Sequence, residues 1–349
     1  MELTKKIYDE TDGQQVYSYT IRNSDNITVE LITYGGTITH LWVPDAKGKL
    51  ADVVTGYDSL AEYAAGRNYF GALVGRCTNR ISQGNYTLDG KKHQLANNAG
   101  SDHLHGGVVG FNKKVWQAED FIFADSAGVV LTLTSPDGDE GYPGNLRVQV
   151  TYTLTNRNEL KIDYAATTNS PTIVNLTHHS YFNLDGHNSG SMLAHKLQIN
   201  GDAYLPIDQA LVPTGEIKPV EGTPMDFRHP HVIGERIAKV PGGYDHTWVL
   251  KNKHDSALQL AARLWGPQSG RLLEVYTDQP GIQFYAGNTL DNDQGKQGAV
   301  YAQHDALCLE TQHFPDSPNH PDFPSVVLKP GEKFVSQTVY RFLNDNNGR

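Results

Sequence analysis

Cysteine, charged residues and long apolar runs are all scarce in this chain of 349 residues. Its two cysteines, Cys77 and Cys308, are too few for a disulfide scaffold and lack the spacing of a metal-binding pair, so we expect reduced thiols. No stretch approaches the roughly 20 apolar residues of a membrane span, and the first residues hold no apolar run of signal-peptide length. The sequence therefore predicts a soluble, cytoplasmic protein.

Positive charge is also in deficit, with 29 Lys and Arg against 39 Asp and Glu and a formal net charge of −10. Nucleic acid and anionic membranes would repel such a chain at long range, so we expect neither as a partner. The sequence also lacks a glycine-rich phosphate loop, a dinucleotide fingerprint and a nucleophile elbow. A small or neutral ligand is therefore expected.

Glycine (34 residues) and tyrosine (18) are plentiful, which is typical of many strands joined by tight turns. The clearest pattern runs from Leu146 to Leu154, where apolar and polar residues alternate as in a strand with one wet face. Other strand-like runs cover 27–43, interrupted at Gly35-Gly36, and 129–134, 160–165, 195–199, 258–264, 272–276, 282–286, 306–311 and 334–342.

Helix signals are few. The best is Ser59–Ala65, where Ser59 and Glu62 have capping-box spacing and Gly66 supplies a stop. No linker, repeat or low-complexity segment divides the chain. The sequence thus predicts an all-β fold, a large antiparallel β-sandwich with few short helices, in a single domain over residues 1–349.

Two adjacent histidines stand in the segment Ile173–Leu184, whose β-branched and aromatic residues predict one continuous strand. Neighbouring side chains of a strand point to opposite faces. His179 would therefore share a polar row with Thr177 and Tyr181, while His178 points the other way. The two histidines are thus not expected to chelate one ion.

Glu310 is the strongest candidate for a general base. It ends the apolar run Ala306–Glu310, and partial desolvation there would raise its pKa towards a useful value. A solvated strand-end glutamate is the alternative interpretation. Asn79, Arg80, Asp245 and Gln283 lie in or near glycine-containing turns and could bind sugar hydroxyls, although structural loops use the same residues.

His103 and His105 precede Gly106 and Gly107, which would let the backbone approach a ligand closely. A His-x-His pair is also a common metal signal. A cupin-type metal site would need a carboxylate a few residues further on, and 106–110 contain none. We therefore expect neither a metal nor a cofactor.

Five motifs occur in order along the chain: Gly75-Arg-x-x-Asn-Arg-Ile81, Leu104-His-Gly-Gly107, the Asn-Leu-Thr-x-His-Ser-Tyr-Phe-Asn-Leu run over 175–184, Gly242-Gly-Tyr-Asp-His246, and Glu310-Thr-Gln-His-Phe-Pro-Asp-Ser-Pro-Asn-His320. Together they resemble the aldose 1-epimerase family, also called galactose mutarotases, from about Tyr34 to Tyr340.

The resemblance implies a single large β-sandwich that interconverts the α and β anomers of hexoses such as galactose and glucose, without cofactor or metal. Matched position by position, it makes Glu310 the general base and His179 the general acid. The substrate contacts that it implies are Asn79, Arg80, His105, Asp245 and Gln283. One position departs from the family, because His178 stands where asparagine is usual.

Two other functions stay open on the residues alone. A carbohydrate-binding sandwich without catalysis would need the hydroxyl-binding residues but no acid and base placed together. A metal-dependent isomerase of cupin type would need a bound metal ion. Proton exchange on a pure anomer and metal analysis of the purified protein separate the three.

Overall fold

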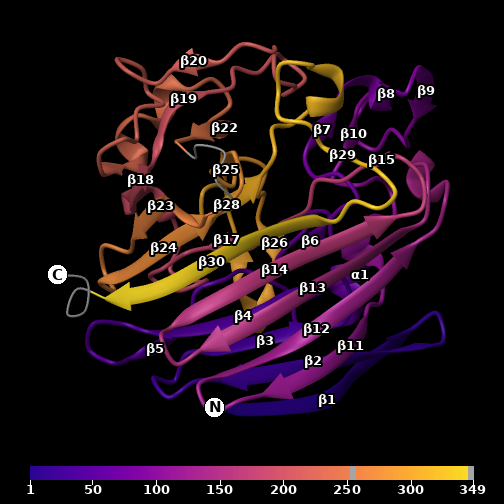
Figure 1. The fold of residues 1–349 in the computed structure, drawn as a ribbon. Coiled ribbons are helices and arrows are strands. Elements are labelled where there is room, and N and C mark those ends of the chain that lie inside the picture. The colour runs from indigo at the N-terminus through magenta and orange to yellow at the C-terminus, as the bar shows by residue number, and fades with distance from the viewer. Residues whose placement is uncertain (252–256, 345–349) are drawn as a thin grey trace.

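Three antiparallel sheets carry most of the chain in the computed structural model, which describes residues 1–251 and 257–344 (Figure 1). The largest has nine strands among the described residues. In order across the sheet they are β11 (Gln117–Ile122), β12 (Ser126–Ser135), β13 (Leu146–Thr155), β14 (Glu159–Thr168), β30 (Phe334–Asn344), β24 (Arg271–Thr277), β23 (Gln259–Trp265), β18 (Lys196–Ile199) and β21 (His231–Val232).

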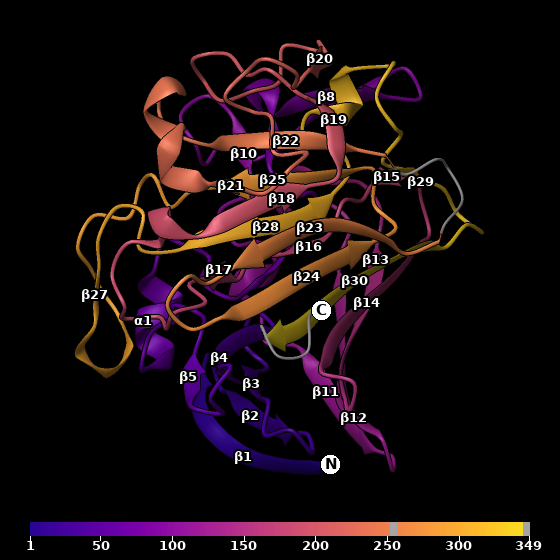
Figure 2. The same ribbon diagram turned by 90° about the vertical axis from the view of Figure 1, so that its left-hand side faces the viewer.

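Two further sheets lie beside this one (Figures 1 and 2). The first runs in sequence order through β1 (Glu2–Thr11), β2 (Gln14–Arg22), β3 (Thr28–Ile32), β4 (Thr37–Pro44) and β5 (Leu50–Asp52). The second has the order β17 (Tyr181–Phe182), β28 (Leu307–Gln312), β25 (Gly281–Tyr285), β22 (Asp245–Leu250), β19 (Gly201–Tyr204) and β20 (Lys218–Pro219). We refer to this second one as the site sheet.

Short ribbons and turns complete the described chain. The two-stranded ribbons pair β6 (Leu73–Val74) with β16 (Thr177–His178), β7 (Arg80–Ile81) with β10 (His103–Leu104), β8 (Asn85–Leu88) with β9 (Lys91–Gln94), β15 (Thr172–Ile173) with β29 (Val327–Leu328), and β26 (Asp293–Gln294) with β27 (Val300–Tyr301). The 3₁₀ turns are η1 (Ser82–Gly84), η2 (Phe111–Lys113), η3 (Asp139–Gly141), η4 (Met192–Ala194), η5 (Ile233–Glu235), η6 (Ile237–Lys239), η7 (Lys296–Gly298) and η8 (Ser317–Asn319).

The predicted all-β sandwich is confirmed, and so are its clearest local signals. Along β13 the buried residues alternate with more exposed ones, as the pattern from Leu146 to Leu154 predicts. The one α-helix of the described residues, α1 (Leu60–Ala65), begins after Ser59, whose side chain forms both halves of the capping box with Glu62. No helix in this described part of the chain is long and apolar enough to cross a membrane.

The prediction of one continuous strand from Ile173 to Leu184 is wrong. The segment contributes three short strands, β15, β16 and β17, and each pairs with a different partner. Asparagine side chains of this segment form hydrogen bonds with backbone groups that lie outside the strands. The Asn175 amide exchanges hydrogen bonds with the backbone of His313, and Nδ2 of Asn183 donates to the carbonyl oxygens of Gly190 and Asp305. The segment therefore passes between sheets instead of lying within one.

The apolar faces of all three sheets meet in one core. It includes Val148 and Val150 of β13, Leu41 of β4, and Leu307 and Leu309 of β28, all essentially inaccessible to solvent. Burial of this apolar area is the dominant favourable term for the fold. Because β28 turns its leucines to the core, its alternate residues Cys308 and Glu310 face the other side of the site sheet.

Four buried histidines and the half-buried His313, all outside the cavity described below, predict a fold that is sensitive to acid. Burial lowers the pKa of His178 to about 3 and the pKa values of His187, His195, His246 and His313 to about 4. Between about pH 6.5 and about pH 4 the unfolded chain therefore binds more protons than the folded chain. As pH falls through that window, each histidine lowers the free energy of unfolding by about 1.4 kcal/mol per pH unit.

We expect the urea midpoint to fall steeply between about pH 7 and about pH 5. His178→Asn, which removes one of these titrations, should flatten the slope by the contribution of one proton. A midpoint that does not change over this interval would contradict the assignment of these histidines as neutral in the fold.

Candidate active site

Side chains on the site sheet form two rows across neighbouring strands. Thr247 of β22 pairs with Gln283 of β25, which pairs with Glu310 of β28. Two residues along the strands, the next row runs through Asp245, Tyr285, Cys308 and Tyr181. Because residues two apart share a face of a strand, both rows project from the side opposite the core.

Five members of these rows, Tyr181, Asp245, Gln283, Tyr285 and Glu310, form one wall of a cavity of about 160 Å³. All seven residues singled out in the sequence line it: Asn79, Arg80, His105, His179, Asp245, Gln283 and Glu310. Tyr181, expected beside His179 in one polar row, lines it as well. Seven further lining residues were not singled out from the sequence: Arg67, Asn68, Tyr69, Leu104, Leu211, Tyr285 and Thr289. Tyr285 could have been found from its spacing of two from Gln283, whereas Arg67 to Tyr69 follow α1 in a loop without a sequence signal.

The opposite wall comes from the ribbon of β7 and β10. The backbone of His105 donates to the carbonyl of Asn79, and the backbone N–H of Asn79 donates to Nδ1 of His105, at 3.1 and 3.2 Å. Gly106 follows, and a Cβ there would lie 1.7 Å from the carbonyl oxygen of Gly75. The sequence predicted a close approach of this backbone to a ligand, whereas the space that Gly106 leaves free is taken by the backbone of Gly75, against which His105 is seated.

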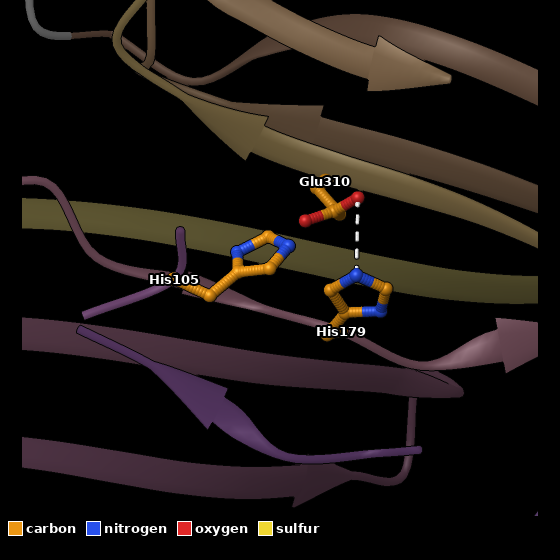
Figure 3. A group of neighbouring side chains, drawn as sticks. All are labelled: His105, His179 and Glu310. Carbon is orange, nitrogen blue, oxygen red and sulfur yellow. Dashed lines mark ion pairs between the residues drawn. The ribbon is translucent and has the colours of Figure 1, made fainter. Parts of the chain in front are cut away.

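Glu310 and His179 face each other inside the cavity (Figure 3). Nε2 of His179 lies 3.6 Å from Oε1 of Glu310, and the two side chains are only 5% and 3% exposed. The His105 ring lies beside them, with its centroid 5.1 Å from that of His179. Glu310 lies within β28 and not at its end, so its carboxylate is more deeply desolvated than the sequence predicted.

Burial determines the protonation of this pair. It raises the pKa of Glu310 well above its ordinary value, and the nearby Asp245 carboxylate raises it further. Burial also lowers the pKa of His179 to about 4. Burial therefore favours the uncharged forms of both groups, a carboxylic acid at Glu310 and a neutral imidazole at His179, over an ion pair.

A chain of hydrogen bonds fixes the polar groups around the base. Oγ1 of Thr247 donates to Oε1 of Gln283 at 2.5 Å, which orients the amide so that Nε2 donates to Oδ1 of Asp245 at 2.6 Å. Burial raises the pKa of Asp245, while the Gln283 hydrogen bond and the charge of Arg80 oppose that rise. Gln283 and Asp245 thus enter the cavity with defined donor and acceptor atoms.

The alternation predicted for the two adjacent histidines holds locally. His178 turns into the core, where its ring packs against Tyr152 and Tyr340 at centroid distances of 5.9 and 6.5 Å. Both of its ring nitrogens lack a hydrogen-bond partner among the described residues. His178 is therefore separated from the cavity that His179 lines.

The donor atoms around the cavity resemble a metal site in number but not in their free lone pairs. His105, His179 and Glu310 each offer one atom within 4.8 Å of the others, so the fold supplies the carboxylate that 106–110 lack. However, Nδ1 of His105 accepts the Asn79 N–H, so the neutral ring carries its proton on Nε2. Neither nitrogen of His105 then offers a free lone pair to a metal, and the donor set fits a metal poorly.

Comparison with known proteins gives one family. A sequence model described as aldose 1-epimerase matches residues 17–341. The chain is 49% identical to galactose mutarotase of Sus scrofa over 91% of this chain and 92% of that protein. It is 38% identical to aldose 1-epimerase of Escherichia coli over 95% and 96% of the two chains.

Two solved structures agree with the sequence matches. An aldose epimerase homologue from C. elegans is 32% identical, with a TM-score of 0.86 over 93% of this chain and 98% of its own. A galactose 1-epimerase from Lactobacillus acidophilus is 30% identical, with a TM-score of 0.86 over 98% and 99% of the two chains.

The raised pKa of Glu310 predicts that this residue costs stability when it ionises. A carboxyl whose pKa is higher in the folded state stabilises the fold below its unfolded pKa, and that contribution is lost as pH rises through the folded pKa. Glu310→Gln cannot ionise. We therefore expect the variant to gain thermal stability over the native chain as pH rises, by about 1.4 kcal/mol per pH unit between the two pKa values.

The measurement is the difference in Tm between Glu310→Gln and the native chain at about pH 5 and about pH 8. Titrating groups distant from Glu310 are common to both proteins and cancel in the difference, which leaves Glu310 and its neighbours Asp245 and His179. An equal difference at both pH values would mean that Glu310 titrates in the fold as it does in the unfolded chain.

Proposed function

The chain belongs to the aldose 1-epimerase family, and we propose that it opens and recloses hexose rings with Glu310 as general base and His179 as general acid. It is an isomerase that interconverts the α and β anomers of hexoses such as galactose and glucose. The observation that carries the assignment is the 3.6 Å contact between Nε2 of His179 and Oε1 of Glu310 inside the cavity. The two reacting oxygens of a pyranose share one carbon, so their base and acid must also be neighbours.

The proton count of the pair suits both halves of the reaction. In the complex with a closed ring, ionised Glu310 takes the proton of the anomeric hydroxyl while protonated His179 gives its Nε2 proton to the ring oxygen. The C1–O5 bond breaks, C1 becomes an aldehyde, and Glu310 is left protonated beside a neutral imidazole. Rotation about C1–C2 and the reverse transfers close the ring to the other anomer, with no net gain or loss of protons.

The remaining cavity residues hold the sugar in our proposal. Arg80 would supply the positive charge that stabilises the ring oxygen as its bond to C1 breaks. Nε2–H of His105 would donate to a hydroxyl, because its Nδ1 is already occupied by the Asn79 N–H. The Asp245 carboxylate and the Gln283 amide, held in place by Thr247, would accept and donate hydrogen bonds on the far side of the sugar.

A carbohydrate-binding sandwich without catalysis is not favoured. Binding alone gains nothing from a carboxylate whose ionisation is opposed by burial, whereas a base with a raised pKa is suited to proton transfer near neutral pH. A metal-dependent route is not favoured either, because of the occupied Nδ1 of His105.

We further propose a cytoplasmic protein of one domain that binds neither nucleic acid nor membranes. The largest core takes in residues from Tyr19 to Phe342, so both ends of the described chain contribute to it. Both cysteines are buried and free, as suits a reducing compartment. The net charge of −10 opposes polyanionic partners.

Glu310→Gln should remove most turnover while sparing sugar affinity, because the amide keeps the shape of the side chain but cannot accept the proton. Loss of a general base typically lowers the rate by about 10²–10⁴-fold. Polarimetry on a pure anomer gives the rate, and calorimetric titration with the sugar gives the affinity. A rate within tenfold of the native enzyme would count against Glu310 as the base.

Substitutions of His179, His105 and His178 should have different effects on kcat and KM. His179→Asn should lower kcat sharply with a small change in KM, because it removes a group used in the transition state. His105→Asn should raise KM as well, since its donor would serve bound sugar and transition state alike. His178→Asn is the matched control: it alters the neighbouring residue on the core side and should leave the rate nearly unchanged. If His178→Asn were inactive and His179→Asn active, the acid would be His178 and not His179.

A further inference from the structure

The second cysteine of the chain lies against the proposed acid. Sγ of Cys308 is 3.5 Å from Nδ1 of His179, the ring nitrogen that faces away from Glu310. Cys308 precedes Glu310 by two residues on β28, so it projects from the same face of the site sheet, and it pairs across the sheet with Tyr181. It is fully buried and does not line the cavity.

Proton transfer through Nε2 places a demand on Nδ1. When protonated His179 gives its Nε2 proton to the ring oxygen, the remaining neutral imidazole has one proton, and it must stay on Nδ1. Only then is Nε2 free to take the proton back as the ring closes. A group that holds the Nδ1 proton in both states would therefore keep the imidazole ready, as a carboxylate does for the histidine of a catalytic triad.

We propose that Cys308 is this positioning residue: its sulfur accepts the Nδ1 proton of His179 and keeps Nε2 as the atom that exchanges protons with the sugar. This inference rests on the proposed role of His179 as the acid. In the described part of the chain, Cys308 is the one side chain within hydrogen-bond distance of that nitrogen.

Ring stacking completes the arrangement. The rings of Tyr69 and Tyr181 stack on the imidazole at centroid distances of 5.8 and 5.1 Å, with interplanar angles of 27° and 28°. Stacking fixes the plane of the imidazole but leaves two orientations that exchange the ring edges. The contact with Cys308 selects the orientation in which Nε2 faces Glu310.

A thiol suits this position better than a stronger acceptor. Burial raises the pKa of Cys308 well above its ordinary value, so the sulfur stays neutral and does not add charge next to Glu310. A carboxylate at this place would stabilise the imidazolium and make His179 a poorer acid. The sulfur is a weak acceptor, which holds the Nδ1 proton without opposing loss of the Nε2 proton.

The direct test is nitrogen NMR of the native enzyme labelled with ¹⁵N-histidine, with the His179 signals assigned by their loss in His179→Asn. We expect Nδ1 to carry a proton at about pH 7 whether or not Nε2 does, although a free neutral imidazole prefers its proton on Nε2. A neutral His179 without a proton on Nδ1 would overturn the proposal. This measurement needs no turnover, so it stands or fails independently of the acid role tested by the His179→Asn rate.

The kinetic test compares Cys308→Ser, which keeps an acceptor, with Cys308→Ala, which removes it. Cys308→Ala should lower kcat by about 10–100-fold with little change in KM, as when the partner of a functional imidazole is lost. Cys308→Ser should recover most of that loss. Cys77→Ala removes the other buried thiol, which lies outside the cavity, and should behave as the native enzyme.

Two kinetic outcomes would overturn the proposal. One is a kcat for Cys308→Ala within twofold of the native value. The other is an equal loss in the serine and alanine variants, which would assign the effect to packing volume. If neither variant folds, the nitrogen spectrum of the native enzyme alone decides.

Discussion

The structure depends on keeping a carboxyl group, Glu310, out of water without a permanent counter-charge. Its neighbour His179 is buried as well, and burial lowers its pKa to about 4, so no ion pair with His179 offsets the cost of ionising Glu310. The cost of burying Glu310 is offset by the apolar area that the other face of the same strand buries, where Leu307 and Leu309 join the main core. Glu310 is held in place because moving it would expose those leucines.

Backbone strain is concentrated in the loops that line the other side of the cavity. Tyr69, Asn79 and His105 all have left-handed backbone, with φ of 55°, 62° and 52°, a conformation that residues other than glycine rarely adopt. Each such residue costs of order 1–3 kcal/mol, and the surrounding structure must impose it. For Asn79 and His105, the pairing of β7 with β10 and their mutual hydrogen bonds do so. In the proposed mechanism the base therefore comes from β28 of the site sheet and the acid from the segment between β16 and β17, while the strained loops add Asn79 and His105 to the groups that would hold the sugar.

Local patterns in the sequence predict β13 and α1 correctly. They fail for a segment whose strand partners lie far away in the sequence. The alternation along β13 and the capping box of α1 depend on neighbours in sequence, and both were predicted within one or two residues. The break of 173–184 into three strands depends on partners in β29, β6 and β28, which no local pattern reports. The same limit applies to the carboxylate beside His105. Residues 106–110 contain none, and the fold supplies one from Glu310, which lies far from His105 in the sequence.

Strand alternation also explains how two adjacent buried histidines can serve different surroundings. His178 and His179 are adjacent, yet one packs among Tyr152 and Tyr340 and the other faces Glu310. Tyr340, against which the His178 ring packs, donates its hydroxyl to the carbonyl of Leu309 at 3.4 Å. That bond ends on the backbone one residue before Glu310, in a strand whose leucines are fixed in the core. Because the His178 side chain lies on the core side and outside the cavity, we expect its substitution to act on stability before it acts on the proposed reaction.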